Sequence, residues 1–250
     1  MYLISIAEGS VKNADGFRLF SETIYRLHPT VQKAQLWVKS ERDKNGKLTR
    51  YNLFCIAYKD GKIQNVTWKD YSPKYYGTCI CISCDGQLLF LPDYEKGVFV
   101  IKISENSVIN RYNLKHIFSI WSTDTSLLCL HRESKRLLTR IVLGTDKVEE
   151  AVKSDGFNII PLSERCVLYR KDHEHYVFAN PDNLHVNMEV AISEWIGTGD
   201  INFNIFRASL KPSGIEAEFF RTDKADHKNI ITERGILICS DELRNFIKNL

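Results

Sequence analysis

The stretch TCICISCDGQLLFL, residues 78–91, decides how the larger part of this 250-residue chain folds. Cysteine and isoleucine alternate from Cys79 to Ile82, as residues on the two faces of a β-strand do. Asp85-Gly86 follows them, and Asp-Gly between apolar runs signals a hairpin because a type I′ turn needs positive φ at both central residues. The stretch therefore predicts a strand, a turn and the next strand.

Cysteine and histidine spacings raise the question of a metal or redox site. Cys81 and Cys84 have Cys-x-x-Cys spacing, but a structural zinc site needs four ligands, and the nearest other candidates are Cys129 and His131. A redox pair belongs at the start of a helix, where the dipole lowers the thiol pKa. The segment 172–175, Asp-His-Glu-His, lies between two apolar runs at a predicted hairpin tip, which lacks the supporting shell that orients metal ligands. We therefore expect no metal and no cofactor.

Similar strands recur after this stretch. Leu89, Leu128 and Val167 each lie in a short apolar run, and successive members are 39 residues apart. A polar turn and a second strand follow each run, and the same spacing reaches Phe206. Short strands repeating near this length are typical of propeller blades, although a plain β-meander or sandwich also places polar turns regularly. For residues 76–250 we expect a mainly β region built as a repeated β-meander, either propeller-like or another all-β arrangement. We expect this region to end in a short helix capped by Ser240.

The first part of the chain has a different pattern. Apolar residues at helical spacing predict a helix that ends at His28-Pro29; they are Phe17, Phe20, Ile24 and Leu27. Three strands are expected over 34–42, 48–58 and 62–69, separated by Asn-Gly and Asp-Gly turns. The pattern over residues 1–75 therefore predicts an α+β module of β-α-β-β-β order. The boundary between this module and the repeat region is expected in YSPKYYG, residues 71–77.

Composition limits the functional classes. The net charge is +3, which is too small to indicate nucleic-acid binding by itself. The seven cysteines are an odd number and no export signal precedes them, which favours free thiols in the cytosol. No stretch approaches the roughly 20 apolar residues that span a bilayer. We expect a cytoplasmic protein.

No catalytic motif is visible, which favours a binding function. The chain lacks a nucleophile elbow, a metalloprotease helix motif, a P-loop and a dinucleotide fingerprint. Because catalytic groups also assemble from distant positions, a hydrolase without a local motif stays an alternative. The predicted turns are mostly acidic, which would steer a basic partner. We expect a non-enzymatic protein-binding module, an inhibitor or immunity protein that occludes a basic protein such as a nuclease toxin. The expected partner-binding residues are Asp93, Tyr94, Glu95, Asp124, Glu149, Glu150, Asp172 and Glu174.

The first hairpin offers a second alternative, which is nucleic-acid binding. Its basic residues stand near Trp37, Tyr51 and Trp68, and cations beside aromatic rings suit single-stranded nucleic acid. Glu41 and Asp43 dilute the positive field of this hairpin. The candidate nucleic-acid contacts are Lys39, Arg42, Lys44, Lys47 and Arg50.

Overall fold

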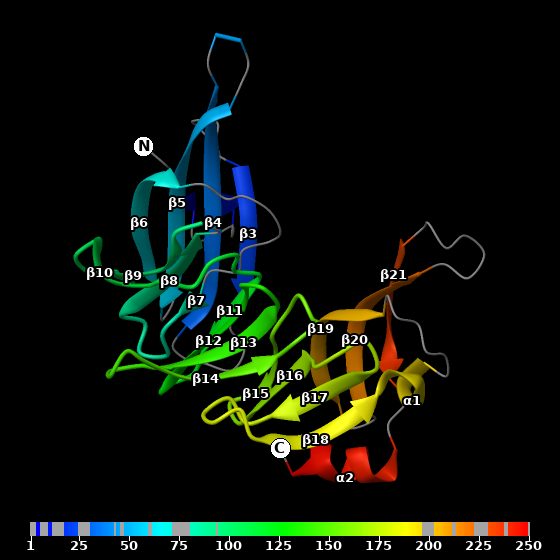
Figure 1. Ribbon diagram of the computed structural model, residues 1–250. Helices are drawn as coiled ribbons and strands as arrows, with labels where there is room; N and C mark the ends of the chain where they lie inside the picture. Colours follow the sequence, from blue (N-terminus) through cyan, green and yellow to red (C-terminus); the bar gives the residue numbers. More distant parts are fainter. Residues whose placement is uncertain are drawn as a thin grey trace. The chain divides into compact units, whose positions relative to one another are not determined.

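The computed structural model groups the chain into two compact units, residues 1–117 and 118–250 (Figure 1). The described residues are 4–5, 10–11, 18–24, 31–42, 44–45, 48–59, 62–71, 81–93, 95–196, 203–211, 214–222, 230–237 and 240–249. Between residues 4 and 71 the description covers the backbone, with side chains at Lys44 and Asn45. Each unit is described by itself below.

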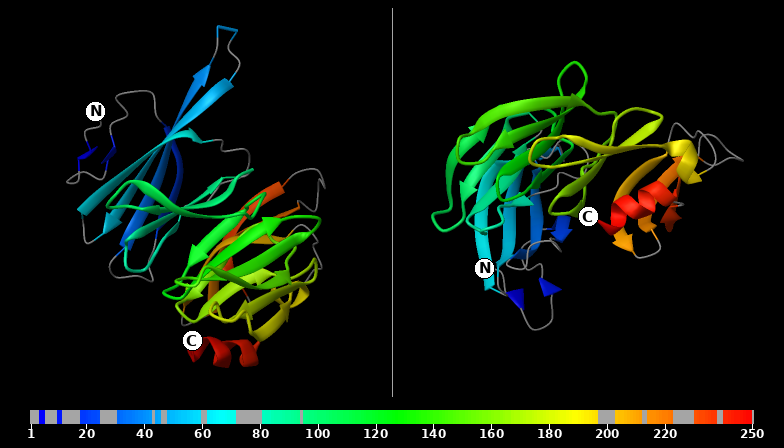
Figure 2. Two further views of the ribbon diagram at one scale, coloured as in Figure 1. Left: turned by 60° about the vertical axis from the view of Figure 1, so that its left-hand side comes forward. Right: turned by 90° about the horizontal axis from the view of Figure 1, so that it is seen from below.

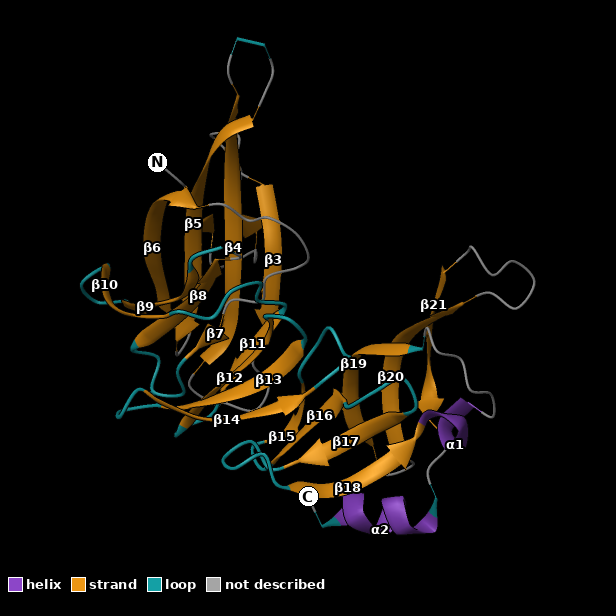
Figure 3. Cartoon of the chain, viewed as in Figure 1, coloured by secondary structure: helices purple, strands orange, loops and turns teal. Residues whose placement is uncertain are grey.

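Antiparallel strands dominate the first unit (Figure 3). A two-stranded sheet pairs β1 (Ile4–Ser5) with β2 (Ser10–Val11). A four-stranded sheet has the order β3-β4-β5-β6, and its strands are β3 (Arg18–Ile24), β4 (Val31–Arg42), β5 (Leu48–Lys59) and β6 (Lys62–Tyr71). A second four-stranded sheet has the order β7-β8-β9-β10, with β7 (Cys81–Ile82), β8 (Leu88–Asp93), β9 (Gly97–Lys102) and β10 (Ser107–Tyr112).

The second unit contains three sheets and two helices. The sheet β11-β12-β13-β14 consists of β11 (Ser119–Ser122), β12 (Ser126–Arg132), β13 (Arg136–Val142) and β14 (Lys147–Lys153). The sheet β15-β16-β17-β18 consists of β15 (Ile160–Ser163), β16 (Cys166–Arg170), β17 (His175–Ala179) and β18 (Val186–Ala191). After α1 (Ile192–Ile196), a three-stranded sheet follows with β19 (Asn204–Lys211), β20 (Gly214–Thr222) and β21 (Ile230–Leu237), and then α2 (Asp241–Lys248).

The predicted repeat is confirmed as a structural unit. Leu89, Leu128 and Val167 each lie on the second strand of a four-stranded meander, where strands pair on both sides. They are 0 to 1% exposed, and a strand buried on both faces reads as a continuous apolar run. Phe206 lies instead on β19, the first strand of its sheet, and α1 stands between β18 and β19 where the earlier sheets follow without a helix.

The prediction of a helix in the first module is wrong. Residues 18–24 form β3, which pairs with β4 from Arg18↔Val38 to Ile24↔Lys33. Pairing supplies the backbone hydrogen bonds and outweighs a helical spacing of apolar residues, because tertiary context overrides local propensity. The three predicted strands are confirmed as β4, β5 and β6. Residues 25–30, with His28-Pro29, lie outside the described part, as do residues 72–80, so the boundary at 75/76 stays a prediction.

The opening stretch forms the predicted strand and turn. Cys81 on β7 is fully buried. The backbone N–H of Gly86 donates to the carbonyl of Ser83 at 2.8 Å, and Gly86 has a φ of 69°. Cys79 lies outside the described residues. Cys81, Cys84, Cys129 and Cys166 form no disulfide, and over the described ranges no three or more His, Cys, Asp or Glu side chains gather as metal ligands would. Nor is any helix in those ranges both long and apolar enough to cross a membrane.

One hydrophobic cluster of the second unit lies between its last two sheets and the helices. Tyr176 and Phe178 face Trp195 of α1, at ring-centroid distances of 5.4 and 6.2 Å. The predicted C-terminal helix is confirmed as α2: Ser240 caps it, and Phe246 packs on Phe178 at 5.6 Å. Both views of Figure 2 show α2 beside the sheets of its own unit. This packing makes the sheets a rigid frame for their turns.

Candidate functional site

The turns of the second unit gather at two ends. Consecutive strands of a meander run in opposite directions, so the turns β11–β12 and β13–β14 share one end of their sheet, and the turn β12–β13 lies at the other. The Thr123 and Thr125 hydroxyls donate to Oδ1 of Asp182, at 3.1 and 2.5 Å. These bonds connect the β11–β12 turn to the β17–β18 turn of the next sheet. The turns 123–125, 143–146, 164–165 and 180–185 therefore lie at the same end.

Short polar side chains hold these turns in place. Thr123 Oγ1 accepts the backbone N–H groups of Thr125 and Ser126, at 3.3 and 3.0 Å. Asn180 Oδ1 accepts the N–H of Asp182 at 2.8 Å. Thr and Asn form such local bonds readily, which is why the sequence makes turns here. The carboxylate of Asp182 is thus fixed from its own turn and from the neighbouring one.

This end of the unit has a negative charge. The four turns and their flanking residues include four exposed carboxylates, on Asp124, Asp146, Glu164 and Asp182. The cations are Lys147 and Arg165, so the net charge is −2. We call this set the acidic end. Exposed carboxylates on a fixed frame attract cations over a Debye length of about 8 Å at physiological salt.

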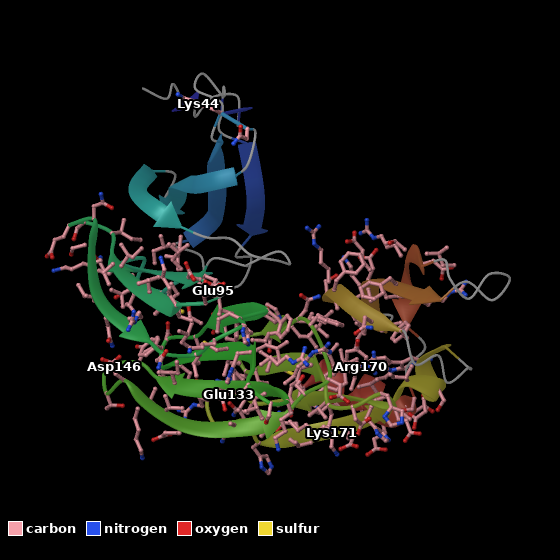
Figure 4. All side chains as sticks on the ribbon, turned by 45° about the horizontal axis from the view of Figure 1, so that its top comes forward. Lys44, Glu95, Glu133, Asp146, Arg170 and Lys171 are labelled. Carbon is pink, nitrogen blue, oxygen red and sulfur yellow. The ribbon has the colours of Figure 1, made fainter. Side chains whose placement is uncertain are left out.

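The opposite end has a positive charge. Its segments are 133–135, 154–159 and 171–174 with their flanking residues. Together they contain six Lys and Arg and four Asp and Glu, so their net charge is +2. We call this set the basic end. The Ser154 hydroxyl connects its sheets by donating to the carbonyl of Arg170 at 2.7 Å. Figure 4 labels Asp146 of the acidic end and Glu133, Arg170 and Lys171 of the basic end.

The predicted Asp-His-Glu-His tip is a structural turn at the basic end. Arg170, which is buried, donates to the carbonyls of Asp172 and His173, at 2.8 and 3.0 Å. Asp172 Oδ1 accepts the backbone N–H of Glu174 and both the N–H and Nδ1 of His175, at 2.8 to 3.0 Å. Partial burial acts to raise the pKa of Asp172, but these hydrogen bonds outweigh it and the pKa is lowered. The carboxylate is therefore engaged within the fold.

The other predicted partner-binding residues are spread over both units. Asp124 is exposed at the acidic end. Glu149 on β14 pairs with Lys147 at 3.4 Å and with Arg140 at 2.5 Å, and these two hydrogen bonds hold its pKa below the usual range. Glu174 is exposed, but it lies at the basic end. The backbone of Glu150 lies on β14, and its side chain is outside the description.

The loop predicted around residues 93–95 belongs to the first unit. Asp93 is fully buried, so the expectation that it lies exposed on a turn is wrong. Its Oδ1 accepts the N–H groups of Glu95 and Lys96, at 3.0 and 2.9 Å, and this caps the turn after β8. Glu95 is exposed, whereas Tyr94 lies outside the described residues.

Sequence reasoning missed three carboxylates of the acidic end, those of Asp146, Glu164 and Asp182. Asp146 and Asp182 stand in turn sequences, Gly-Thr-Asp at 144–146 and Asn-Pro-Asp at 180–182. Such turn residues are recognisable in a sequence. That the two turns share an end with Asp124 follows from strand order, which the 39-residue spacing does not contain.

The candidate nucleic-acid residues surround the first hairpin. The structure describes a turn at Lys44-Asn45 with Lys44 exposed, and Gly46 of the predicted Asn-Gly turn lies outside the described residues. Lys39 and Arg42 lie on β4 and Arg50 on β5, where the structure describes the backbone. Lys47 lies outside the described residues. Nucleic-acid binding stays a prediction.

The chain is similar in structure to BamB from Moraxella catarrhalis, a β-propeller. The TM-score is 0.52 at 8% sequence identity, over 86% of this chain and 63% of that protein, so this chain spans less than two thirds of its length. No family model matches the chain, and the search of curated proteins found no significant match. At this identity the likeness shows the fold, and it confirms the mainly β, propeller-like meander.

Proposed function

We propose that the chain is a non-enzymatic protein-binding module whose acidic end docks on a basic protein. The observation that carries the proposal is the gathering of Asp124, Asp146, Glu164 and Asp182 at one end of a rigid sheet frame. As the specific form we propose an inhibitor or immunity protein that covers a basic partner such as a nuclease toxin. Carboxylates would pair with Lys and Arg of the partner, and the frame would block access to its working surface.

Rigidity and charge both support this function. A turn held by hydrogen bonds loses little conformational entropy on binding, so more of the interaction energy appears as affinity. Complementary charge mainly raises the association rate and disfavours wrong partners. The basic end of the same unit would repel a cationic surface, so the partner would approach in one orientation.

The test compares two matched double variants. Asp124→Asn with Asp146→Asn neutralises the acidic end, and Glu133→Gln with Glu174→Gln makes the same charge change at the basic end. Binding is measured against a panel of purified, catalytically inactivated basic nuclease domains, at two salt concentrations. Asn suits position 146, where φ is 57°.

We expect at least one panel member to bind with a Kd below about 1 µM. Its association rate should fall about fivefold or more in the acidic-end variant and stay within about twofold in the control. No binding by any member, or equal loss in both variants, would contradict the proposal.

The cytosol is the compartment that we propose for this function. Cys81, Cys129 and Cys166 are buried thiols that form no disulfide, and a reducing compartment keeps thiols in that state. Cell fractionation with an antibody against the chain tests this placement, and recovery in a secreted or membrane fraction would contradict it.

A further inference from the structure

The sheet β19-β20-β21 differs from the other sheets of the repeat in its outer strand. In the sheets β7–β10, β11–β14 and β15–β18, a fourth strand pairs outside the third. In the last sheet the third strand, β21, is the outer one, and within the described ranges no strand pairs with its second edge. The backbone N–H and C=O groups along such an edge form a template for a further strand.

β21 also differs from the other outer strands in the register of its pairing with the neighbouring strand. The pairing of β10, β14 and β18 with their neighbours is interrupted by a register shift in each case. Bulges of this kind twist an edge and protect it from pairing. β21 pairs with β20 without interruption from Leu237↔Ile215 to Ile230↔Thr222, so the strand is regular over its eight residues.

The side chains of β21 do not protect the edge either. Glu233 forms a two-pronged pair with Arg221, at 2.6 and 3.1 Å, and Arg234 pairs with Glu216 at 3.1 Å. The strand holds one charge of each sign, and each has an opposite charge in its own sheet, so no net charge guards the edge. Ile236 is 57% exposed, and a Cβ added at Gly235 would meet no atom within 4 Å. Apolar surface and open space both lie at this part of the strand.

A second copy of this chain fits the edge poorly. In an antiparallel pair, directly opposite residues share a face, so two β21 strands related by a twofold axis must be centred on a residue. The two longest registers are centred on Glu233 and on Arg234. Each places like charges opposite one another, which is unfavourable. The occupant that fits is a strand with a different sequence.

We propose that the free edge of β21 binds an extended segment of a partner protein, which pairs antiparallel or parallel as the fourth strand of this sheet. Backbone hydrogen bonds would supply most of the affinity, and alternate side chains the specificity. The segment would place an apolar β-branched or aromatic residue opposite Ile236 and no cation opposite Arg234. This surface is separate from the acidic end and does not depend on the function proposed for it.

The experiment uses the full chain and a set of synthetic octapeptides with blocked termini. Val, Ile or Thr alternate with Ser or Glu in the set, and each peptide has a counterpart with a central proline, which cannot complete the backbone pairing. Binding is followed by fluorescence polarisation, and its location by amide hydrogen exchange. We expect at least one peptide to bind and to protect the amides of β21, while its proline counterpart does neither.

Two variants with an equal change of charge give the control. Ile236→Lys places a cation on the proposed edge, and Val186→Lys places one at a 44% exposed apolar position on β18, whose pairing is bulged. Peptide binding should weaken about tenfold in the first and stay unchanged in the second. Neutralising Asp124 and Asp146 should leave peptide binding intact.

Three results would overturn the proposal. The first is an equal effect of the two lysine variants. The second is failure of the whole peptide set to protect β21, or equal protection of β10, β14 and β18. The third is concentration-dependent dimerisation of the chain alone with protection of β21, which would assign the edge to a second copy.

Discussion

Replacing Gly97 with alanine tests a close backbone approach in the first unit. Gly97 begins β9 opposite the buried Asp93 and has a φ of +102°. A Cβ at this position would lie 2.1 Å from the carbonyl oxygen of Tyr112 on β10. Gly144, in the β13–β14 turn, is a matched control because its φ is +89° and a Cβ there would meet nothing within 4 Å.

The two substitutions differ in whether the added Cβ clashes with neighbouring backbone atoms. Alanine at positive φ costs about 1–2 kcal/mol at either position. At Gly97 the clash adds a cost like that of overpacking, about 1–3 kcal/mol, because backbone must move to relieve it. We therefore expect Gly97→Ala to destabilise its unit by about 2–5 kcal/mol and Gly144→Ala by about 1–2 kcal/mol. A loss at the upper end is a large share of the roughly 5–15 kcal/mol that stabilises a domain.

Amide hydrogen exchange measures the effect locally, which matters because the chain has two units. The slowest amides of β8 and β9 report on Gly97→Ala, and those of β12 and β13 report on Gly144→Ala. Urea unfolding gives the corresponding midpoints. If Gly97→Ala costs no more than Gly144→Ala, the close approach of Gly97 to β10 is wrong, and with it the geometry of the turn that carries Glu95.

Three further perturbations test the second unit. Tyr176→Phe removes the hydroxyl that accepts the buried Ile205 N–H at 2.8 Å, so urea unfolding should show a loss of about 1–3 kcal/mol, and a loss below about 0.5 kcal/mol would contradict this bond. Burial raises the pKa of Tyr176 from 10.0 and of Cys166 from 9.0, each to about 12. Because the folded state favours the neutral form of both groups, their contribution to the free energy of unfolding is complete below pKa values of 10.0 and 9.0. It is lost as pH rises through about 12, by about 3–4 kcal/mol per group. An unchanged urea midpoint between about pH 8 and pH 11 would refute this pH dependence. Ser240→Ala removes the cap that accepts the Leu243 N–H at 3.2 Å, and the amides of α2 should exchange faster by the equivalent of about 1 kcal/mol, whereas unchanged exchange would show that the cap does not stabilise the helix.

The sequence located one turn of the acidic end, and the partner-binding role of its residues stays a prediction. Asp124 was identified because an acidic residue between two apolar runs indicates an exposed turn, and the structure places it there. The same reasoning misplaced Asp93, because a carboxylate that caps its own turn is folded inward against backbone N–H groups. It also missed Asp182, whose relation to Asp124 depends on hydrogen bonds across 57 and 59 positions of sequence.

The sequence alone determined the local units of this protein. The alternation of Cys79 to Ile82, the Asp85-Gly86 turn, the 39-residue spacing and the Ser240 cap all depend on residues a few positions apart or on a simple repeat. Tertiary structure decided the rest: that residues 18–24 join a sheet as β3, that two separate acidic turns share an end, and that β21 is a regular outer strand among the described residues. Each of these depends on which distant strands pair, and backbone pairing across a long loop leaves no local pattern of side chains.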